Sequence, residues 1–464
     1  MTVIGRTHRP VVDNQLCQQC SICVRACPAE TFKEFRSEKD TARGYVYTNT
    51  DLLTREILPP CEGACPIGQQ VRSYIHLLGA GNPREALLVI RRDNPLPGVC
   101  GYVCHHPCEQ ACVRGSWDEP VAIRELKRRA VHYEMEHEQE VIELLRQWKH
   151  VPREKKVVII GAGPAGLACG FELVMQGFEV TIRDALDQPG GMLVGGIPPF
   201  RLPRSVVTHD VHVIQSLGVD FVGSTRLDND FTVVDVRKDD ADAVVLATGA
   251  WKDLSMGVPG EDAKGYFECL EFLRGVNAGR MTKLTGTVLV IGGGNAALDT
   301  ARSALRLGPE RVIVMYRRSR EEMPASPEDL EDALREGVMI RFLEAPTRII
   351  VEGGRVRGVE VIEMELREID DTGRRRSVPR EGSGFSERAD TIITAIGQRP
   401  EVPFLSPSAI TGRGTVRCDE VGLVHGYEGV FAAGDAVSGP STIVEAIASG
   451  KAVAHRVMNY LNGK

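Results

Sequence analysis

Ten of the thirteen cysteines lie within the first 112 residues, and their spacing is that of iron–sulfur ligands. The first group reads C-x-x-C-x-x-C-x-x-x-C before Pro28, a run in which three thiolates surround one cluster and the fourth ligates another. In the second group, the last four cysteines recur at strict intervals of four residues. The candidate metal ligands are Cys17, Cys20, Cys23, Cys27, Cys61, Cys65, Cys100, Cys104, Cys108 and Cys112. We expect these residues to build 4Fe-4S clusters.

Disulfide bonds and structural zinc are the alternatives for these cysteines. The N-terminus MTVIGRTHRP has no apolar stretch of a secretory signal, so we expect a cytoplasmic protein with reduced thiols. Zinc sites prefer paired C-x-x-C units with a long gap between them, which the first group lacks, and zinc is the less favoured alternative. Cys169, Cys269 and Cys418 stand alone, and we interpret each as a small buried hydrophobe.

A dinucleotide fingerprint follows the cysteines. An apolar strand at 157–160 runs into Gly161-x-Gly163-x-x-Gly166, a helix opens, and a second strand ends at Asp184. The glycines let a backbone turn approach a pyrophosphate at the positive end of the helix. Asp184 can accept a hydrogen bond from a ribose hydroxyl. Strand, turn, helix, strand and terminal acid in this order predict a Rossmann-like domain.

A second fingerprint, Gly292-x-Gly294-x-x-Ala297, has the same strand–turn–helix setting. Where the first copy ends in an acid, this one reads Tyr-Arg-Arg, with Arg317 and Arg318. Two guanidiniums without an acid favour a 2′-phosphate, and therefore NADPH over NADH. Surface ion pairs are the alternative interpretation of these arginines.

Two further strands end in Gly249 and Gly397, and they bracket the second fingerprint. This order predicts a nicotinamide domain inserted within a flavin domain. The return segment places Asp435 after a strand and before an apolar helix, where its carboxylate could hold a ribityl hydroxyl. A simple N-cap aspartate is the alternative.

Composition limits the remaining possibilities. A chain of 464 residues is too long for one core, and we expect roughly two to four domains. The formal charge of −7 has no blocks of like charge and gives no reason to expect nucleic acid or an anionic membrane as partner. No run approaches the ~20 apolar residues of a membrane span. Many glycines follow apolar β-branched runs, which suits a doubly wound α/β protein.

Several motifs in register resemble one family over residues 58–464. They are GAGPAGL, PGGML, GIPPFRLPR, GGGNAALDTAR, YRRSREEMPA and AAGDAVSGPSTIVEAIASGKAVA. Together they resemble the small subunit of glutamate synthase and its relatives, including the electron-input part of dihydropyrimidine dehydrogenase and the large subunit of the NADH-dependent ferredoxin:NADP oxidoreductase. The resemblance implies an α/β fold, with two Rossmann-like domains for FAD and NAD(P) after a mainly helical iron–sulfur domain.

The resemblance also assigns cofactors to residues. It implies non-covalent FAD at Gly161, Gly163, Gly166, Asp184 and Asp435. It implies NAD(P) at Gly292, Gly294, Asn295, Arg317 and Arg318. Further candidate cofactor-binding residues are Pro164, Ala165, Gly191, Met192, Gly249, Ala296, Gly397, Gly434 and Thr442. We expect no catalytic acid or base, because the flavin carries the chemistry.

The expected domains follow from these assignments. We predict a ferredoxin-like iron–sulfur segment at 1–60, a helical iron–sulfur domain and linker at 61–150, an FAD domain at 151–265 with 385–464, and an NAD(P) domain at 266–384.

The chain departs from the family at two places. Relatives usually carry an extra C-x-x-C where this chain reads TREILPP, and Lys127 stands where a Gln or Glu can complete a cluster. We therefore expect two or three clusters and leave their individual ligands open.

The function that these features predict is a subunit that exchanges hydride between NAD(P)H and FAD. It would pass single electrons through 4Fe-4S clusters to or from other subunits of a larger oxidoreductase, such as a 2-oxoacid or aldehyde oxidoreductase complex. The glutamate synthase small chain is the alternative, although that subunit normally lacks the first cysteine run. A non-catalytic assembly module is disfavoured by the intact fingerprints, and a disulfide reductase by the absence of a C-x-x-C pair from either nucleotide domain.

Overall fold

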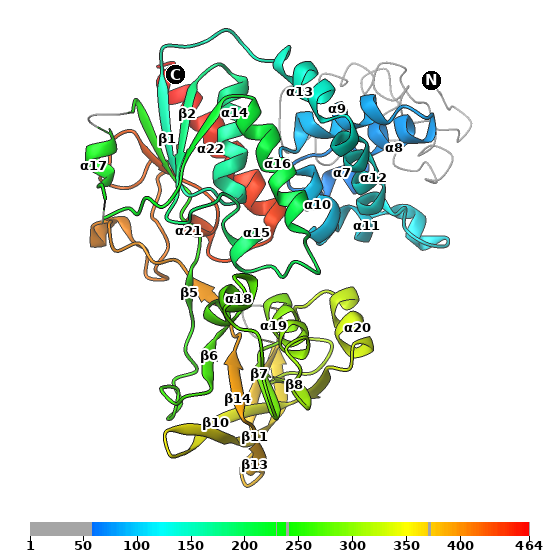
Figure 1. The fold of residues 1–464 in the computed structure, drawn as a ribbon, viewed down its shortest axis with the longest axis vertical. Helices are drawn as coiled ribbons and strands as arrows, with labels where there is room; N and C mark the ends of the chain where they lie inside the picture. The colour runs from blue at the N-terminus through cyan, green and yellow to red at the C-terminus, as the bar shows by residue number, and fades with distance from the viewer. Residues whose placement is uncertain (1–57, 229, 238–240, 370–372, 464) are drawn as a thin grey trace. The chain divides into compact units, whose positions relative to one another are not determined.

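The computed structural model describes residues 58–463, apart from 229, 238–240 and 370–372 (Figure 1). Its described residues form two compact units. The first unit contains 58–190, 204–248 and 417–463, and the second contains 191–203 and 249–416. The predicted ferredoxin-like segment, with Cys17, Cys20, Cys23 and Cys27, lies outside the described residues.

The first unit begins with short helices that carry the second cysteine group. These are α7 (Pro60–Gly63), α8 (Val71–Gly79), α9 (Pro83–Asp93), α10 (Pro97–Val103), α11 (Pro107–Gln110), α12 (Ile123–Glu136) and α13 (Glu138–Arg146). Proline opens α7, α9, α10 and α11, where its missing N–H costs no helical hydrogen bond. Val71, Tyr74 and Ile75 are buried on one face of α8, the pattern of an amphipathic helix.

A parallel sheet forms the rest of the first unit, with strand order β16-β4-β1-β2-β3. Its strands are β1 (Lys156–Ile160), β2 (Glu179–Arg183), β3 (Val219–Val222), β4 (Ala243–Leu246) and β16 (Val430–Ala432). Helices α14 (Pro164–Met175), α16 (Arg204–Ser216) and α22 (Ile443–Leu461) cover one face of the sheet (Figure 1). A Cβ at Gly450 would lie 2.1 Å from the Ala165 carbonyl oxygen, so this glycine is what lets α22 approach α14.

Buried ion pairs join the helices that precede the sheet to α16, which covers the sheet, within this unit. Arg91 on α9 is fully buried and pairs with Glu134 on α12 at 2.8 Å and with Asp210 on α16 at 2.9 Å. The second oxygen of Asp210 accepts a hydrogen bond from the Val99 N–H of α10 at 2.8 Å. Removing one partner of such a buried pair typically costs about 3–5 kcal/mol, so the network fixes α9, α12 and the cysteine-bearing α10 to α16.

The second unit contains another parallel sheet and an antiparallel one. The parallel order is β6-β14-β7-β8-β9, built from β6 (Tyr266–Glu268), β7 (Thr287–Ile291), β8 (Arg311–Tyr316), β9 (Met339–Phe342) and β14 (Thr391–Thr394). The antiparallel order is β10-β11-β12 with β13 on β11, from β10 (Glu344–Glu352), β11 (Arg355–Ile369), β12 (Arg375–Pro379) and β13 (Phe385–Arg388). A two-stranded pair joins β5 (Lys252–Asp253) to β15 (Gln398–Arg399).

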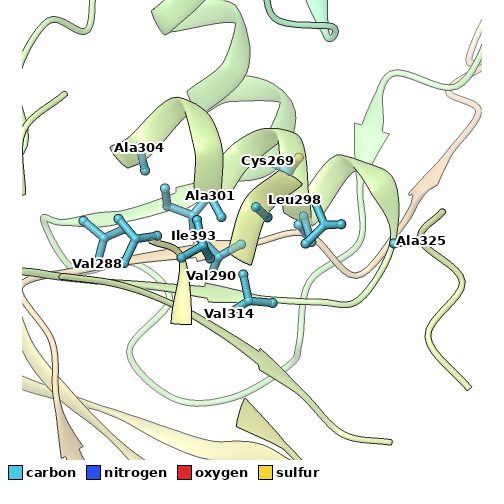
Figure 2. Close-up of a cluster of buried hydrophobic side chains, with 14 of the residues drawn as sticks. Cys269, Val288, Val290, Leu298, Ala301, Ala304, Val314, Ala325 and Ile393 are labelled. Carbon is cyan, nitrogen blue, oxygen red and sulfur yellow. The ribbon is translucent and has the colours of Figure 1, made fainter. Parts of the chain in front are cut away.

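The second unit also contains the helices α18 (Cys269–Asn277), α19 (Asn295–Leu305) and α20 (Pro327–Arg335). Figure 2 shows its core, where Val288, Val290 and Ile393 of the sheet face Leu298 and Ala301 of α19. The β-branched residues of the strands and the small residues of the helix explain the close packing of this layer.

The division into units differs from the predicted domain boundaries at 265/266 and 384/385. Strand β13 pairs with β11, and β14 lies between β6 and β7, so both belong to the second unit. Residues 191–203 also join the second unit, although they lie between two segments of the first. An apolar run indicates a strand but not the sheet that the strand enters, so the compact units differ from the predicted domains. The assignment of FAD and NAD(P) to these domains stays a prediction.

The described part of the chain contains no helix with the length and apolar character needed to cross a membrane.

Candidate cofactor-binding sites

The first fingerprint forms a tight turn between β1 and α14. Gly161 has φ +110°, and a Cβ there would lie 2.3 Å from the Ala247 carbonyl oxygen. A Cβ at Gly166 would lie 1.9 Å from the Gly161 oxygen, so both glycines are required by the fold. Gly163 differs, because no atom lies within 4 Å of the place where its Cβ would be. This open backbone at the start of α14, followed by Pro164 at N1, fits a pyrophosphate.

Asp184 follows β2 and supports this turn. Its two carboxylate oxygens accept hydrogen bonds from Ala162 N at 2.6 Å and Leu186 N at 2.8 Å. Burial raises the pKa of Asp184. The carboxylate therefore stands beside the turn, and its contact with a ribose hydroxyl stays a prediction.

The return segment meets the first fingerprint within the first unit. Gly434 has φ +65°, and its Cβ would lie 2.8 Å from the Cβ of Ala165. Asp435 opens the short helix α21 (Asp435–Ser438) and accepts from Ser441 Oγ at 3.0 Å, while burial raises its pKa to about 6. Thr442 caps α22 through a capping box with Glu445. Both predicted cofactor residues thus have local structural partners, and their flavin contacts stay predictions.

The second fingerprint forms a similar turn between β7 and α19. A Cβ at Gly292 would lie 2.2 Å from the Ala395 carbonyl oxygen, whereas Gly294 has no atom within 4 Å of that position. Asn295 is the first residue of α19, followed by Ala296, and its Oδ1 accepts from Ser326 N at 2.8 Å. The open space at Gly294 fits a second pyrophosphate.

The two predicted arginines have different environments. Arg317 follows β8 and is exposed. Arg318 is 6% exposed, and its Nε donates to the Arg375 carbonyl oxygen of β12 at 2.9 Å. Selection of a 2′-phosphate stays a prediction, and the structure favours Arg317 as the residue that makes it.

Three of four further predicted cofactor residues lie where the chain passes between sequence segments of the two units, and the fourth, Gly397, lies within a segment of the second unit. Gly191 precedes Met192, the first residue of α15 (Met192–Gly195), and Gly249 follows the last residue of a first-unit segment. Gly249 and Gly397 have φ of +73° and +126°, a region open mainly to glycine. All four belong to the second unit.

Six of the predicted cluster ligands lie on the short helices or within two residues of their ends, and none of the six forms a disulfide bond. No three His, Cys, Asp or Glu side chains among the described residues converge as ligands of a single metal ion. The hydrogen bond from the Cys100 thiol, opposed by burial and helped by Lys127, lowers the pKa of Cys104 to about 6. The same hydrogen bond raises the pKa of Cys100, and burial raises the pKa of Cys108 to about 12. The fit of this donor set to iron–sulfur ligation therefore rests on the number and spacing of its cysteines rather than on the pKa of one thiol.

Lys127 is buried on α12 among these thiols. Burial lowers the pKa of its ammonium. The negative charge of the nearby Cys100, Cys65, Cys104 and Cys108 raises this pKa by more than burial lowers it, so the pKa of Lys127 is raised overall. Lys127 therefore adds positive charge to the thiolate environment.

Comparison with known proteins decides the family. Residues 155–450 match the family model described as pyridine nucleotide-disulphide oxidoreductase, and residues 57–139 match dihydropyrimidine dehydrogenase domain II, 4Fe-4S cluster. The chain belongs to the pyridine nucleotide-disulphide oxidoreductase family. The predicted fold class, the FAD, NAD(P) and 4Fe-4S cofactors, and the assignment as an oxidoreductase are confirmed by these matches.

The chain is also similar to individual curated proteins. The chain is 42% identical over 87% of its length to the NADP(+)-dependent formate dehydrogenase subunit beta of Moorella thermoacetica, and it spans 60% of that protein. It is 33% identical over 87% of its length to the glutamate synthase [NADPH] small chain of Escherichia coli K12 and spans 89% of it. The predicted resemblance to the glutamate synthase small-subunit family is thus confirmed.

The fold has a solved counterpart. FprA of Mycobacterium tuberculosis in complex with NADPH matches 67% of this chain and 85% of its own, with a TM-score of 0.58 and 19% identity. At this identity the match supports the fold alone.

The buried polar residues around these sites have no signal in the local sequence. Arg91 and Asp210 are 119 residues apart, and no local pattern connects them. Arg201 lies within the GIPPFRLPR motif, which marked the family without indicating a role for the arginine.

Proposed function

We propose that this protein is the NAD(P)H-linked electron-transfer subunit of a larger oxidoreductase. It exchanges hydride between the nicotinamide coenzyme and FAD, and passes single electrons through its 4Fe-4S clusters to or from a partner. When bound, FAD supplies the conversion between hydride and single-electron chemistry, which no side chain provides.

One observation carries this proposal: the cysteine-bearing helices and the first dinucleotide turn belong to one compact unit. Val99, which directly precedes Cys100, donates its N–H to Asp210 of the helix that covers the sheet. This bond and the buried Arg91 pairs hold a thiol-rich segment in a fixed position on the domain that we assign to FAD. Fixed proximity of this kind is what electron exchange between a flavin and a cluster requires.

The protein's own residues bind and orient the cofactors. Gly163 and Gly294 leave the helix N-termini open to the two pyrophosphates, and Arg317 is available to a 2′-phosphate. We therefore propose NADPH as the preferred coenzyme. No acid or base is assigned, because hydride exchange requires none from the protein.

We propose a 2-oxoacid or aldehyde oxidoreductase complex as the partner class. The Moorella relative is, by its name, a subunit of a formate dehydrogenase. This similarity supports the proposal that the present protein is also a subunit of a larger complex. The glutamate synthase small chain remains the second candidate, since the chain spans 89% of that relative. The first cysteine run favours the former, because that small chain normally lacks it.

Anaerobic rapid mixing of the purified protein with NADPH or NADH tests the proposed chemistry. We expect flavin bleaching, followed by the electron paramagnetic resonance signals of reduced 4Fe-4S clusters. A protein without flavin, or one that neither coenzyme bleaches, would contradict the proposal. Cross-linking and purification of the native complex then separates the two partner classes, because a large glutamine-using subunit identifies glutamate synthase.

A further inference from the structure

Residues 191–203 lie in the sequence between two segments of the first unit but pack within the second unit. Asn277 of α18 donates its side-chain amide to the carbonyl oxygens of Val194 and Ile197 at 3.3 Å each and to that of Gly195 at 3.0 Å. In the same segment, the ring of Phe200 stacks on the guanidinium of Arg306, which directly follows α19, with 3.8 Å between the ring centroid and Arg306 Cζ. The segment is therefore held to α18 and α19 at several points.

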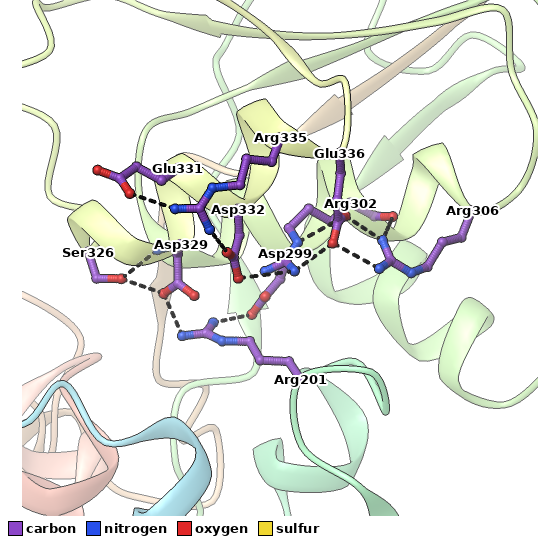
Figure 3. A network of polar contacts seen from close by, with 10 residues as sticks. All are labelled: Arg201, Asp299, Arg302, Arg306, Ser326, Asp329, Glu331, Asp332, Arg335 and Glu336. Atoms are coloured by element: carbon purple, nitrogen blue, oxygen red, sulfur yellow. Dashed lines mark hydrogen bonds and ion pairs between the residues drawn. The ribbon is translucent and has the colours of Figure 1, made fainter. Parts of the chain in front are cut away.

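Arg201 makes the strongest of these attachments (Figure 3). Its Nη1 donates to Asp299 Oδ2 on α19 and its Nη2 to Asp329 Oδ2 on α20, each at 2.7 Å. The side chains of the three residues are only 9–15% exposed. One guanidinium thus forms ion pairs with two poorly solvated carboxylates.

These carboxylates are connected to the coenzyme turn. Asp299 lies four residues after Asn295 on α19, about 6 Å along the helix axis. Asp329 Oδ2 accepts from Ser326 Oγ at 2.7 Å, and Ser326 N donates to Asn295 Oδ1 at 2.8 Å. Both aspartates therefore adjoin the helix end that we assign to the pyrophosphate.

Negative charge near this helix end would oppose an anionic ligand. The N-terminus of α19 attracts a pyrophosphate through its free N–H groups and its dipole. Two carboxylates in a poorly solvated region would weaken that attraction, and a cation that pairs with both restores it. Arg201 is such a cation, supplied by a segment distant in sequence.

We propose that Arg201 is a positioning residue of the coenzyme site, which neutralises Asp299 and Asp329 so that the turn at Gly292–Asn295 binds the pyrophosphate. This inference rests on the proposed function and extends it. Because Arg201 acts on the pyrophosphate end, its removal should weaken NADP⁺ and NAD⁺ by the same factor.

The test measures equilibrium binding of NADP⁺ and NAD⁺ to the flavin-loaded protein by calorimetry. R201M should weaken both by about tenfold or more, the usual scale for loss of a charge-assisted contact. R201K should stay within about threefold of wild type, because it keeps the charge. Arg335 provides the matched control: it also pairs with carboxylates of α20, but its side chain is 70% exposed, and R335M should leave both affinities within about twofold.

A charge-rescue variant separates electrostatic positioning from a structural role. R201M/D299N should bind both coenzymes more tightly than R201M, whereas loss of a structural contact would not be repaired by losing a second one. Wild-type affinity in R201M, loss confined to NADP⁺, or no rescue would overturn the inference. If R201M cannot be recovered with FAD, D299N decides: it keeps the arginine and removes a negative charge, so weaker binding would refute the proposal. A wild type that binds neither coenzyme would instead refute the proposed function.

Discussion

At the scale of single residues, the two fingerprints separate glycines that the fold needs from glycines that a ligand needs. Gly161 and Gly292 each lie against a backbone carbonyl of a neighbouring strand's end, so any side chain there would disturb the protein itself. Gly163 and Gly294 have extended backbones with φ of −75° and −91° and open space beyond them. Only the second pair can be tested for binding without loss of the fold.

Replacing Gly163 with valine should therefore remove FAD while the protein stays folded. Valine tolerates the extended backbone, but its side chain would occupy the space that we assign to the pyrophosphate. Absorbance at the flavin bands measures the loss, and circular dichroism measures the fold. The reciprocal variant, Gly294→Val, should keep FAD and lose NADP⁺ binding. Stoichiometric FAD in Gly163→Val would show that the first turn is not the flavin site.

The paired arginines show how far residue types alone can predict specificity. Two adjacent guanidiniums suggested one clamp, yet Arg318 donates to the backbone of β12. Burial by a hairpin 57 residues away has no signature in the local sequence. The structure therefore narrows the specificity prediction to Arg317.

Neutralising Arg317 should weaken NADPH much more than NADH. We expect a loss of about 1.5–3 kcal/mol for NADPH, the usual contribution of a hydrogen bond to a charged group. Steady-state kcat/KM for both coenzymes measures it, with Arg320→Ala as the control, because Arg320 is also exposed in the following loop. Equal losses for the two coenzymes, or a wild type that prefers NADH, would contradict the assignment.

At the scale of elements, the charged contacts between α12, α13 and α16 make packing sensitive to pH. His209 on α16 lies 2.7 Å from Glu138 and 3.3 Å from Glu134. Burial lowers the pKa of His209, but the hydrogen bond and charge of Glu134 together with the charge of Asp210 raise it, and the net effect is a raised pKa. A histidine with a raised pKa stabilises the fold fully below its unfolded value of ~6.5, and this contribution is lost as pH rises through the folded value.

His209→Gln should consequently lower the melting temperature most at low pH. We expect a drop of about 2 °C or more at pH 6 and a smaller one at pH 9, measured anaerobically on the loaded protein. His212→Gln is the matched control, because His212 also contacts Glu138 but its side chain is 48% exposed. A drop that grows with pH, or an equal pH dependence in the control, would be inconsistent with this account.

The positions of strands and helices along the chain were predicted better than the sheet or unit that each of them joins. The strands and helices around both fingerprints occur where the apolar runs and the glycine-rich turns predicted them. The placement of β13 and β14 depended on which sheet had an edge to receive them, and residues 191–203 depended on Arg201 and Asn277. Such long-range pairing has no period within one segment, so the domain boundaries could not be read from the sequence.

At the scale of the whole molecule, two cysteine groups have different relations to the nucleotide domains. The second group is linked to α16 of the first unit through Val99 and the buried ion pairs of Asp210, and it lies within the matched 4Fe-4S family region. The first group precedes that region in the sequence. Hydride exchange between coenzyme and flavin should need only residues after about 150, so loss of the first group should affect electron delivery alone.

Changing Cys20 to alanine tests this separation. Iron content should fall, and electron delivery to the natural partner should slow, while NADPH reduces the bound flavin at close to the wild-type rate. Iron analysis counts the loss, and rapid-mixing absorbance follows the flavin. Cys418→Ala is the matched control, because Cys418 is a lone free thiol in the first unit and its replacement should leave the iron content unchanged. If Cys20→Ala retained all its iron, the first group would not ligate a cluster, and a zinc or purely structural role for these cysteines would have to replace it.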